Sequence, residues 1–506
     1  AWSQVPFDHV AETGQIGGRE YYVVFPDTVA NVQDDRFSSK RLGDPEDYVL
    51  LIYSPVEQTV RIGQSGGQME PVSIAAHQTV EYDLRLTVIP MTTPNRPSEK
   101  VVHVEAASPI VLYAYMSNPF GTVAFTPLPV GSWGNKYFAA AWPADHVENI
   151  RVRPRDVGKA PTKVPAPAQI VVIASQDETV VDFLPTGPLA DCNGCTSVTL
   201  DGGESYMITS IGDTTAYRQR EGTIEIAGTV IRSNKPIGVI SGNSRTAIGD
   251  PTQTWLNGNS RKDQTAEWLR PVELHGTEFV HTLVFDQLRY LGVDFDRERG
   301  REFLRIYPTF DEQTVLARYN VAGQLQMIDG GAQIDPSDYF DLAVDNFEAG
   351  SYRASGPAQA FIAPNSHAAF RGTTGSGQFV GSAYDTWGSG MVELMPRAQW
   401  SSFAAFRAPS VPATTRHFVN LVTDTNSRFS IRYGQADGPL QGFPLFYMIP
   451  GTDLVWGSVM ITAGTSYIVE GTEGARFSGY VYGNDPGYEL DRDPRGGIAE
   501  SYEEII

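Results

Sequence analysis

The chain has 506 residues, of which 41% are hydrophobic and 11% aromatic, and its formal net charge is −21 at pH 7. This apolar content excludes a disordered chain, and the length predicts three to five domains of about 100–150 residues. The acidic surface disfavours nucleic acid and anionic membranes as partners, and its ordinary role is solubility.

The start of the chain and its apolar runs bear on localisation. The sequence begins Ala1-Trp2-Ser3, without Met and without a charged region followed by an apolar one. We expect a mature protein whose signal peptide has been removed, although an arbitrary start would look the same. No run of 18 apolar residues occurs, so no membrane span is expected. The 49 Gly and 34 Pro residues favour short strands joined by turns over helices.

A hairpin pattern recurs along the chain. Each copy has an apolar strand, a turn of Pro, Asp, Asn, Glu or Gln, and a strand of alternating character. The copies are 47–63, 169–185, 302–319 and 417–434. A strand–turn–strand element with a Tyr in its second strand is expected after each hairpin. These elements begin at Val72, Val198, Ala332 and Val459, and their tyrosines are Tyr82, Tyr206, Tyr339 and Tyr467.

The third recurring element contains a proline corner, seen in "VIRSNKPIGVISGN" at 230–243. Proline cannot donate to a strand ladder, so two short strands with a fixed corner are expected. Related stretches occur at 105–118, 353–365 and, more weakly, 474–484. We take the corner as a framework motif, and recurrence for geometric reasons is weak evidence for catalysis. Its residues are Lys235, Pro236, Gly242, Asn243, Pro109 and Pro357.

Linkers with a Pro followed by Trp or His separate the copies. The predicted units are four β-repeats and a tail, at 1–127, 128–270, 271–396, 397–483 and 484–506. Each repeat offers about seven strands, which is typical of a β-sandwich. The fold prediction is therefore all-β, with four tandem sandwich-like repeats. The alternative is a β-propeller with two blades per repeat. The acidic tail is expected to be an extended arm, either disordered or packed along a neighbour.

Cys192 and Cys195 are the only cysteines. A zinc site needs a second ligand pair, and a thioredoxin-like site should open a helix after a strand. The surrounding Pro and Gly residues indicate a loop instead. We predict a disulfide that staples this loop, which favours an oxidising compartment.

The sequence around the corner resembles a known family. "TIEIAGTVIRSNKPIGVISGN" followed by "AEWLRPVELHGTEFV" resembles the domain near the N-terminus of the mucin-like IgG Fc-binding protein, which also occurs in many secreted bacterial proteins. The matching positions are Thr229, Ile231, Ser233, Lys235, Pro236, Ile237, Val239, Ser241, Gly242, Asn243, Glu267, Leu269, Pro271, Gly276, Glu278 and Phe279. Family members usually have "GNxC" after the corner, whereas Ser244 and Arg245 follow here.

The resemblance implies an extracellular, non-catalytic protein, and in the bacterial members it suggests a cell-surface or matrix role. The Fc-binding label is not carried over, because this chain lacks the Cys-rich modules that accompany the domain in the animal protein. Resemblance is good across about 130–290 and weaker elsewhere.

Other candidate sites carry little catalytic signal. "GQSGG" around Ser65 matches G-x-S-x-G but lacks the strand–turn–helix context of a nucleophile. The loop 372–390 lacks the Lys and helix of a phosphate site. Paired acids that a glycosidase needs lie beside Arg in loops, which indicates solvated ion pairs. These are Asp34 with Asp35, Asp294 with Asp296, and Asp491 with Asp493. No cofactor is expected, and loop oxygens leave room for Ca²⁺ without naming ligands.

Six tryptophans, if exposed, offer surfaces on which sugars stack, although such residues more often fill joints between domains. They are Trp133, Trp142, Trp255, Trp268, Trp387 and Trp400.

These patterns predict a non-enzymatic, extracellular cell-surface structural protein. Its partner is expected to be itself, in a filament or array, or another surface protein, joined by strand addition through the tail or residues 1–17. The alternatives are a monomeric adhesin that binds glycan or glycoprotein, and a glycan-active enzyme.

Overall fold

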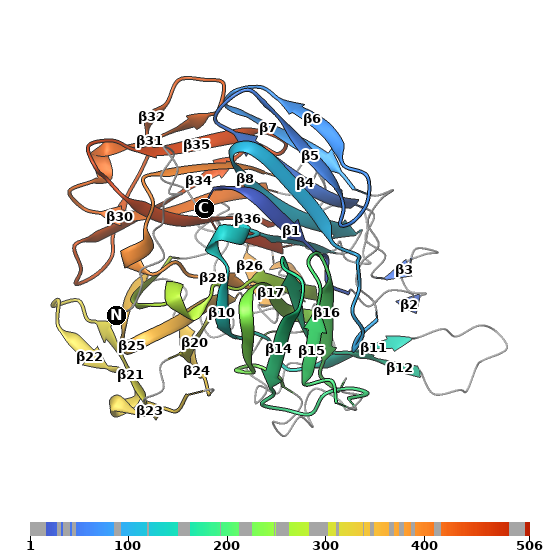
Figure 1. The fold of residues 1–506 in the computed structure, drawn as a ribbon. Helices are drawn as coiled ribbons and strands as arrows, with labels where there is room; N and C mark the ends of the chain where they lie inside the picture. The colour runs from blue at the N-terminus through green and yellow to red at the C-terminus, as the bar shows by residue number, and fades with distance from the viewer. Residues whose placement is uncertain are drawn as a thin grey trace, which may run out of the picture.

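A computed structural model describes most of the chain. The described residues are 17–27, 32–33, 41–42, 47–84, 93–118, 121–149, 162–192, 194–211, 225–246, 248, 263–282, 302–309, 313–336, 338–344, 349–363, 369–373, 379–385, 390–408, 416–484 and 501–505. Their regular structure consists of β-strands and short 3₁₀ turns, which confirms the all-β prediction. Figure 1 shows four groups of strands around a common centre, coloured in chain order from blue to red.

Repeat 1 contains two four-stranded sheets that share one long strand. Its strands are β1 (Gly18–Val23), β4 (Asp47–Ser54), β5 (Gln58–Gln64), β6 (Glu70–Ile74), β7 (Gln78–Asp83), β8 (Val102–Asn118) and β9 (Gly121–Phe125). The first part of β8 lies between β1 and β5, with β6 beyond β5, and we call this the outer sheet. The second part lies between β9 and β4, with β7 beyond β4, and this is the inner sheet.

Repeats 2 and 3 have the same plan. Repeat 2 contains β10 (Gly134–Phe138), β13 (Ala168–Ala174), β14 (Thr179–Leu184), β15 (Ser197–Leu200), β16 (Ser205–Thr209), β17 (Val230–Thr246) and β18 (Asp263–Trp268). Repeat 3 contains β19 (Gly276–His281), β20 (Glu302–Pro308), β21 (Thr314–Tyr319), β22 (Leu325–Met327), β23 (Gln333–Ile334), β24 (Phe340–Val344), β25 (Gly350–Ala363) and β28 (Val392–Glu393). The shared strands are β17 and β25.

Repeat 4 follows the plan with the shared strand broken in two. Its strands are β29 (Phe403–Arg407), β30 (Arg416–Asp424), β31 (Ile431–Gln435), β32 (Gln441–Gly442), β33 (Tyr447–Met448), β34 (Leu454–Ile461), β35 (Ser466–Gly471), β36 (Phe477–Asn484) and β37 (Ser501–Ile505). Tyr467 lies in β35, which pairs with β29 and β31 as the first part of β8 pairs in repeat 1. Assigning Tyr467 to the element after the hairpin was therefore wrong.

Short ribbons and 3₁₀ turns complete the described structure. The ribbons pair β2 (Val32–Gln33) with β3 (Arg41–Leu42), β11 (Asp145–Asn149) with β12 (Thr162–Ala166), and β26 (Ala369–Thr373) with β27 (Phe379–Asp385). The 3₁₀ turns include η2 (Val130–Ser132), η4 (Val272–Leu274) and η6 (Arg397–Gln399) in the linkers, with η5 (Ile328–Gly331) and η7 (Arg428–Ser430) elsewhere.

The four repeats close into a ring in which the central strand of each inner sheet is buried on both faces. In β4, Leu50 and Ile52 join a core with repeat 2, while the alternate residues Val49 and Leu51 join a core with repeat 4. The other two cores link repeats 2 and 3 and repeats 3 and 4 in the same way. Each repeat is sandwich-like, as predicted, and each core is completed by the inner sheet of the next repeat.

The tail contributes to this ring. β37 pairs antiparallel with β36 of the same chain, in the place that β9, β18 and β28 occupy in the other inner sheets. β37 also lies beside β9, where repeat 4 meets repeat 1. The sequence predicts a tail that is disordered or packed along a neighbour. In the structure, residues 501–505 of the tail instead pair with a strand of their own chain.

Candidate functional site

The sequence predicts two short strands at the proline corner, whereas the structure has one long strand, β17, which passes from one sheet to the other there. In β17, Ile231–Ser233 pair with β14, and Ile237–Asn243 pair with β13. Pro236 lies between these two stretches, and Pro109 and Pro357 lie at the same place in β8 and β25. Lys235 Nζ donates to Asp177 O in the neighbouring turn. The corner therefore serves the framework of every repeat that keeps it.

The residues after the corner bind backbone rather than a ligand. The amide of Asn243 accepts from Trp142 N at 2.8 Å and donates to Trp142 O at 2.7 Å. Ser241 Oγ accepts from Ala140 N and donates to Ala140 O. A Cβ on Gly242 would lie 2.0 Å from Thr265 O, so this close approach requires glycine. The SGN motif thus fastens the strand to segment 140–142.

The start of the repeat is fastened to the corner by a tyrosine. Tyr137 OH donates to Ile237 O and accepts from Gly134 N, and Tyr21 makes the same pair of bonds with Ile110 O and Gly18 N. Burial raises the pKa of both phenols well above the ordinary value, so they remain donors.

The predicted disulfide is present between Cys192 and Cys195, in the loop that follows β14. Cys195 is buried within the core of repeat 2. The crosslink therefore anchors the loop to its own repeat.

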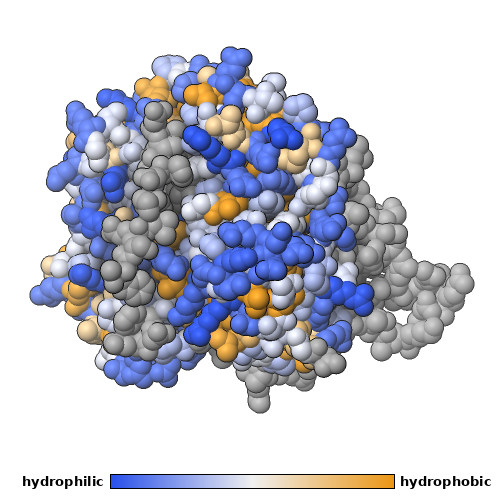
Figure 2. All heavy atoms as spheres, viewed as in Figure 1, coloured by the Kyte–Doolittle hydropathy of each residue, from blue (hydrophilic) through white to orange (hydrophobic). Residues whose placement is uncertain are grey.

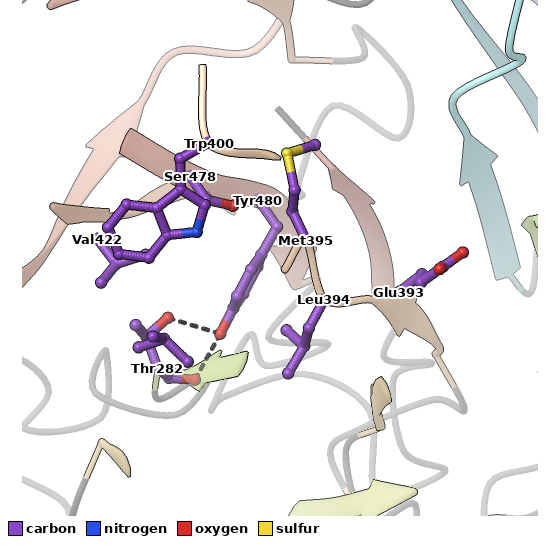
Figure 3. A pocket seen from close by; sticks show the side chains of 10 residues that line it. Thr282, Glu393, Leu394, Met395, Trp400, Val422, Ser478 and Tyr480 are labelled. Carbon is purple, nitrogen blue, oxygen red and sulfur yellow. Dashed lines mark hydrogen bonds between the residues drawn. The ribbon is translucent and has the colours of Figure 1, made fainter. Parts of the chain in front are cut away.

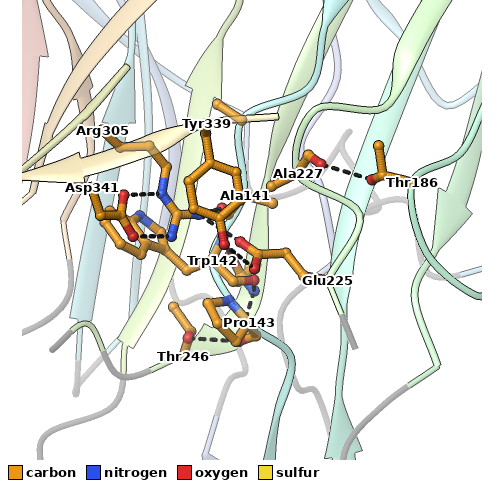
Figure 4. Close-up of polar contacts among 12 residues, drawn as sticks. Ala141, Trp142, Pro143, Thr186, Glu225, Ala227, Thr246, Arg305, Tyr339 and Asp341 are labelled. Carbon is orange, nitrogen blue, oxygen red and sulfur yellow. Dashed lines mark hydrogen bonds and ion pairs between the residues drawn. The ribbon is translucent and has the colours of Figure 1, made fainter. Parts of the chain in front are cut away.

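The seam between repeats 2 and 3 holds a buried arginine (Figure 4). Arg305 of β20 lies between the rings of Trp142 and Tyr339, at 4.0 and 3.8 Å from their centroids. It donates twice to Asp341, at 2.7 Å each, and also to Glu225 at 2.5 Å. Burial lowers the pKa of Arg305, but the carboxylates of Asp341 and Glu225 outweigh burial and hold it well above its ordinary value.

The second aromatic ring is held in place by the same acid. Tyr339 OH donates to Glu225 at 2.6 Å, and Arg305 also donates to Ala141 O at 2.6 Å. The Arg305 guanidinium and the Tyr339 hydroxyl therefore donate to acceptors from the two repeats. The sequence analysis missed it, although a charged residue within the apolar strand 302–308 was a usable signal.

The seam between repeats 3 and 4 is different. Arg397 of η6 binds Glu278 at 3.0 Å, and it also binds Asp424 and Asp453 of repeat 4. Its side chain is 28% exposed, compared with 4% for Arg305.

A small hollow lies beside this seam (Figure 3). Tyr480, Trp400, Met395 and Val422 line it, and Tyr480 OH points toward Thr282. The hydroxyl donates to Thr282 O at 2.5 Å and accepts from Thr282 Oγ1 at 2.9 Å. Tyr480 and Thr282 are therefore bonded to each other across the seam.

The structure describes some of the remaining candidates from the sequence and leaves others outside the described residues. Ser65 packs against Gly203 of repeat 2, and no hydrogen bond in the described part of the chain joins it to His103, which binds Glu20 at 3.1 Å. The three acid pairs, Trp255 and Trp387 lie outside the described residues, as do 374–378 and 386–389 of the expected loop 372–390, whereas 379–385 of that span form strand β27. Trp133, Trp142, Trp268 and Trp400 are buried in the seams, which favours their role in joints.

Within the described residues, no group of three or more His, Cys, Asp or Glu side chains is placed to hold a metal ion. No helix there is long and apolar enough to cross a bilayer.

Comparison with known families gives one match. The family model described as IgGFc binding protein matches residues 123–483, more than half of the chain. The chain belongs to this family. No individual curated protein matches it. Membership points to an extracellular binding or structural protein, and the match includes the corner, the SGN motif and the Arg305 cluster.

Proposed function

We propose that the chain is a non-enzymatic structural protein of the bacterial cell surface that associates with copies of itself. The observation that carries the proposal is the use of the recurring motif. The side chains of Asn243, Ser241 and Tyr137 form hydrogen bonds with the backbone of their own repeat. The guanidinium of Arg305 donates hydrogen bonds to groups of both repeats at their seam. Motif residues that bind their own framework favour a scaffold over a catalyst.

The disulfide supports the same proposal. The Cys192–Cys195 crosslink suits an oxidising compartment, as an extracellular protein meets. A ring of four repeats leaves sheet edges and loops as its contact surfaces. Such edges are where proteins associate by strand addition.

The first experiment is light scattering after size exclusion on the purified chain, with and without calcium, followed by negative-stain microscopy. Self-associating particles that grow with concentration are the expected result. A monomer at every concentration would reject self-association. A change on adding calcium would identify the ion as part of assembly.

A second candidate is a monomeric adhesin for glycan or glycoprotein. The family description favours it, because it names a protein ligand. A binding screen that includes IgG Fc, other glycoproteins and glycans tests it. Specific binding by a chain that stays monomeric would select this candidate over the first.

A further inference from the structure

Apolar side chains are exposed on neighbouring elements of repeats 3 and 4. In repeat 3, Val321 at the β21–β22 turn is 79% exposed and Met327 of β22 is 63% exposed. In repeat 4, Phe429 and Met448 are 75% and 57% exposed. In Figure 2, hydrophobic residues gather at the lower left edge, where Figure 1 places β22.

Contacts across the seam join these residues into one surface. A Cβ on Gly451, just after β33, would lie 1.7 Å from Asn320 O in the β21–β22 turn, so the two turns touch. On the other side of β33, Thr425 Oγ1 lies 3.8 Å from Met448 Sδ. Thr425 O accepts from Arg428, whose guanidinium lies 4.2 Å from the ring centroid of Phe429. We call this surface the seam patch.

The edge strand in the seam patch lacks the usual protection. β22 ends the outer sheet of repeat 3, and within the described residues no strand pairs with its outer side. The corresponding strand of repeat 1, β6, begins with Glu70 and Pro71, which discourage pairing with another chain. β22 instead reads Leu325-Gln326-Met327, and all three residues are exposed. The same structural position is thus protected in one repeat and open in another.

The distribution of charge indicates which partner binds the seam patch. Residues 319–328 and 438–452 contain no charged side chain, in a chain whose net charge is −21. Two copies that approach through most other surfaces bring acidic residues together, which costs free energy. Through these two segments they meet with apolar side chains and with the edge of β22, which no other described strand covers.

We propose that the seam patch is the contact for a second copy of this chain, with β22 of the two copies paired antiparallel about a two-fold axis. Gln326, the middle residue of β22, lies at the axis. The inference rests on the proposed self-association and names its surface. Such a contact is isologous, so it gives a dimer, and larger assemblies need a second interface.

Charge substitution tests the contact in the full chain. Met327→Glu places a carboxylate opposite the apolar Leu325 of the other copy and brings the two Glu side chains diagonally near each other across the axis, so we expect dimer affinity to fall about tenfold or more. Thr199→Glu, on the exposed face of the corresponding edge strand β15, is the matched control and should leave association unchanged. Sedimentation measures the dissociation constant, and unaltered circular dichroism shows that both variants fold.

A crosslink tests the geometry. The described cysteines are joined in one disulfide, so an introduced Cys is a unique reporter. Under oxidation, Gln326→Cys should give covalent dimers and Thr199→Cys should not. Association that Met327→Glu leaves intact would overturn this contact while preserving self-association. A monomer at every concentration would overturn both, and protection of 325–327 from hydrogen exchange in that monomer would show that the same chain covers the edge.

Discussion

The two seams that flank repeat 3 are each joined by an arginine, and the two arginines differ in their surroundings. Arg305 is 4% exposed, is stacked between two rings and faces two carboxylates. Arg397 is 28% exposed and faces three carboxylates, of which Asp453 is 71% exposed. Solvent therefore screens the Arg397 guanidinium and Asp453 more than the Arg305 guanidinium, whereas Asp341 and Asp424 are similarly exposed, at 34% and 37%.

From this difference we expect that the larger number of ion pairs does not make the stronger seam. A buried cation must be matched, because its removal leaves Glu225 and Asp341, which are 18% and 34% exposed, close together without a counter-charge. A half-exposed cation has water as a substitute partner. We therefore expect the seam between repeats 2 and 3 to depend on a single side chain, and the next seam to depend on packing.

The largest effect is expected from Arg305→Met. The substitution leaves Glu225 and Asp341 facing each other without their cation and should destabilise the seam by about 3–5 kcal/mol. Denaturant unfolding gives the total loss, and hydrogen exchange shows whether β20 and segment 139–142 open first.

Arg305→Lys is the matched control. Lysine keeps the charge but lacks the planar fork that binds Asp341 twice and stacks between the rings. An intermediate loss is expected. If Arg305→Met unfolds at the same denaturant concentration as the parent chain, the cluster does not stabilise the seam.

Some features of the fold could be predicted from the sequence and others could not. The corner at Pro236 was predictable because proline acts on its own backbone, and four similar hairpins identified repeats. The closed ring was not predictable from the sequence, because it depends on which face of each inner sheet contacts the next repeat. Both faces of those strands are apolar, so alternation along the sequence does not distinguish them.

The same limit applies to the site. The Cys192–Cys195 disulfide was inferred from neighbouring residues, and the structure contains it. The Arg305 cluster draws Trp142, Glu225 and Asp341 from distant positions. No short motif records such a cluster. Only the misplaced charge in a buried strand indicated that a partner must exist.

The next effect concerns a contact that both seams share. A Cβ on Gly276 would lie 2.3 Å from Pro396 Cβ, and one on Gly134 would lie 2.4 Å from Pro271 Cβ. Gly276→Ala and Gly134→Ala should each cost about 1–3 kcal/mol through overpacking. Gly131→Ala is the control, because no atom lies within 4 Å of that Cβ. Unequal losses at the two seams, measured by denaturant unfolding, would contradict a common packing device.

A smaller effect is expected from Tyr480→Phe, which tests the polar contact at the seam between repeats 3 and 4. The variant leaves Thr282 O without its donor and should cost about 1–2 kcal/mol. Combining it with Thr282→Val in a double-mutant cycle isolates the pair. Strict additivity in thermal or denaturant unfolding would show that the two side chains do not act together.

The smallest effect is expected from Arg397→Ala, at about 1 kcal/mol or less, because water reaches the guanidinium, which is 28% exposed, and its partner Asp453, which is 71% exposed. Ionic strength distinguishes it from Arg305. Raising salt should shrink the difference between Arg397→Ala and the parent chain, since the Debye length falls from about 10 Å at 0.1 M to 3 Å at 1 M. The loss caused by Arg305→Met should change little, because burial keeps ions away from that cluster. If both losses fall with salt to the same extent, burial does not separate the two seams, and the stronger dependence on Arg305 must come from its two stacked rings.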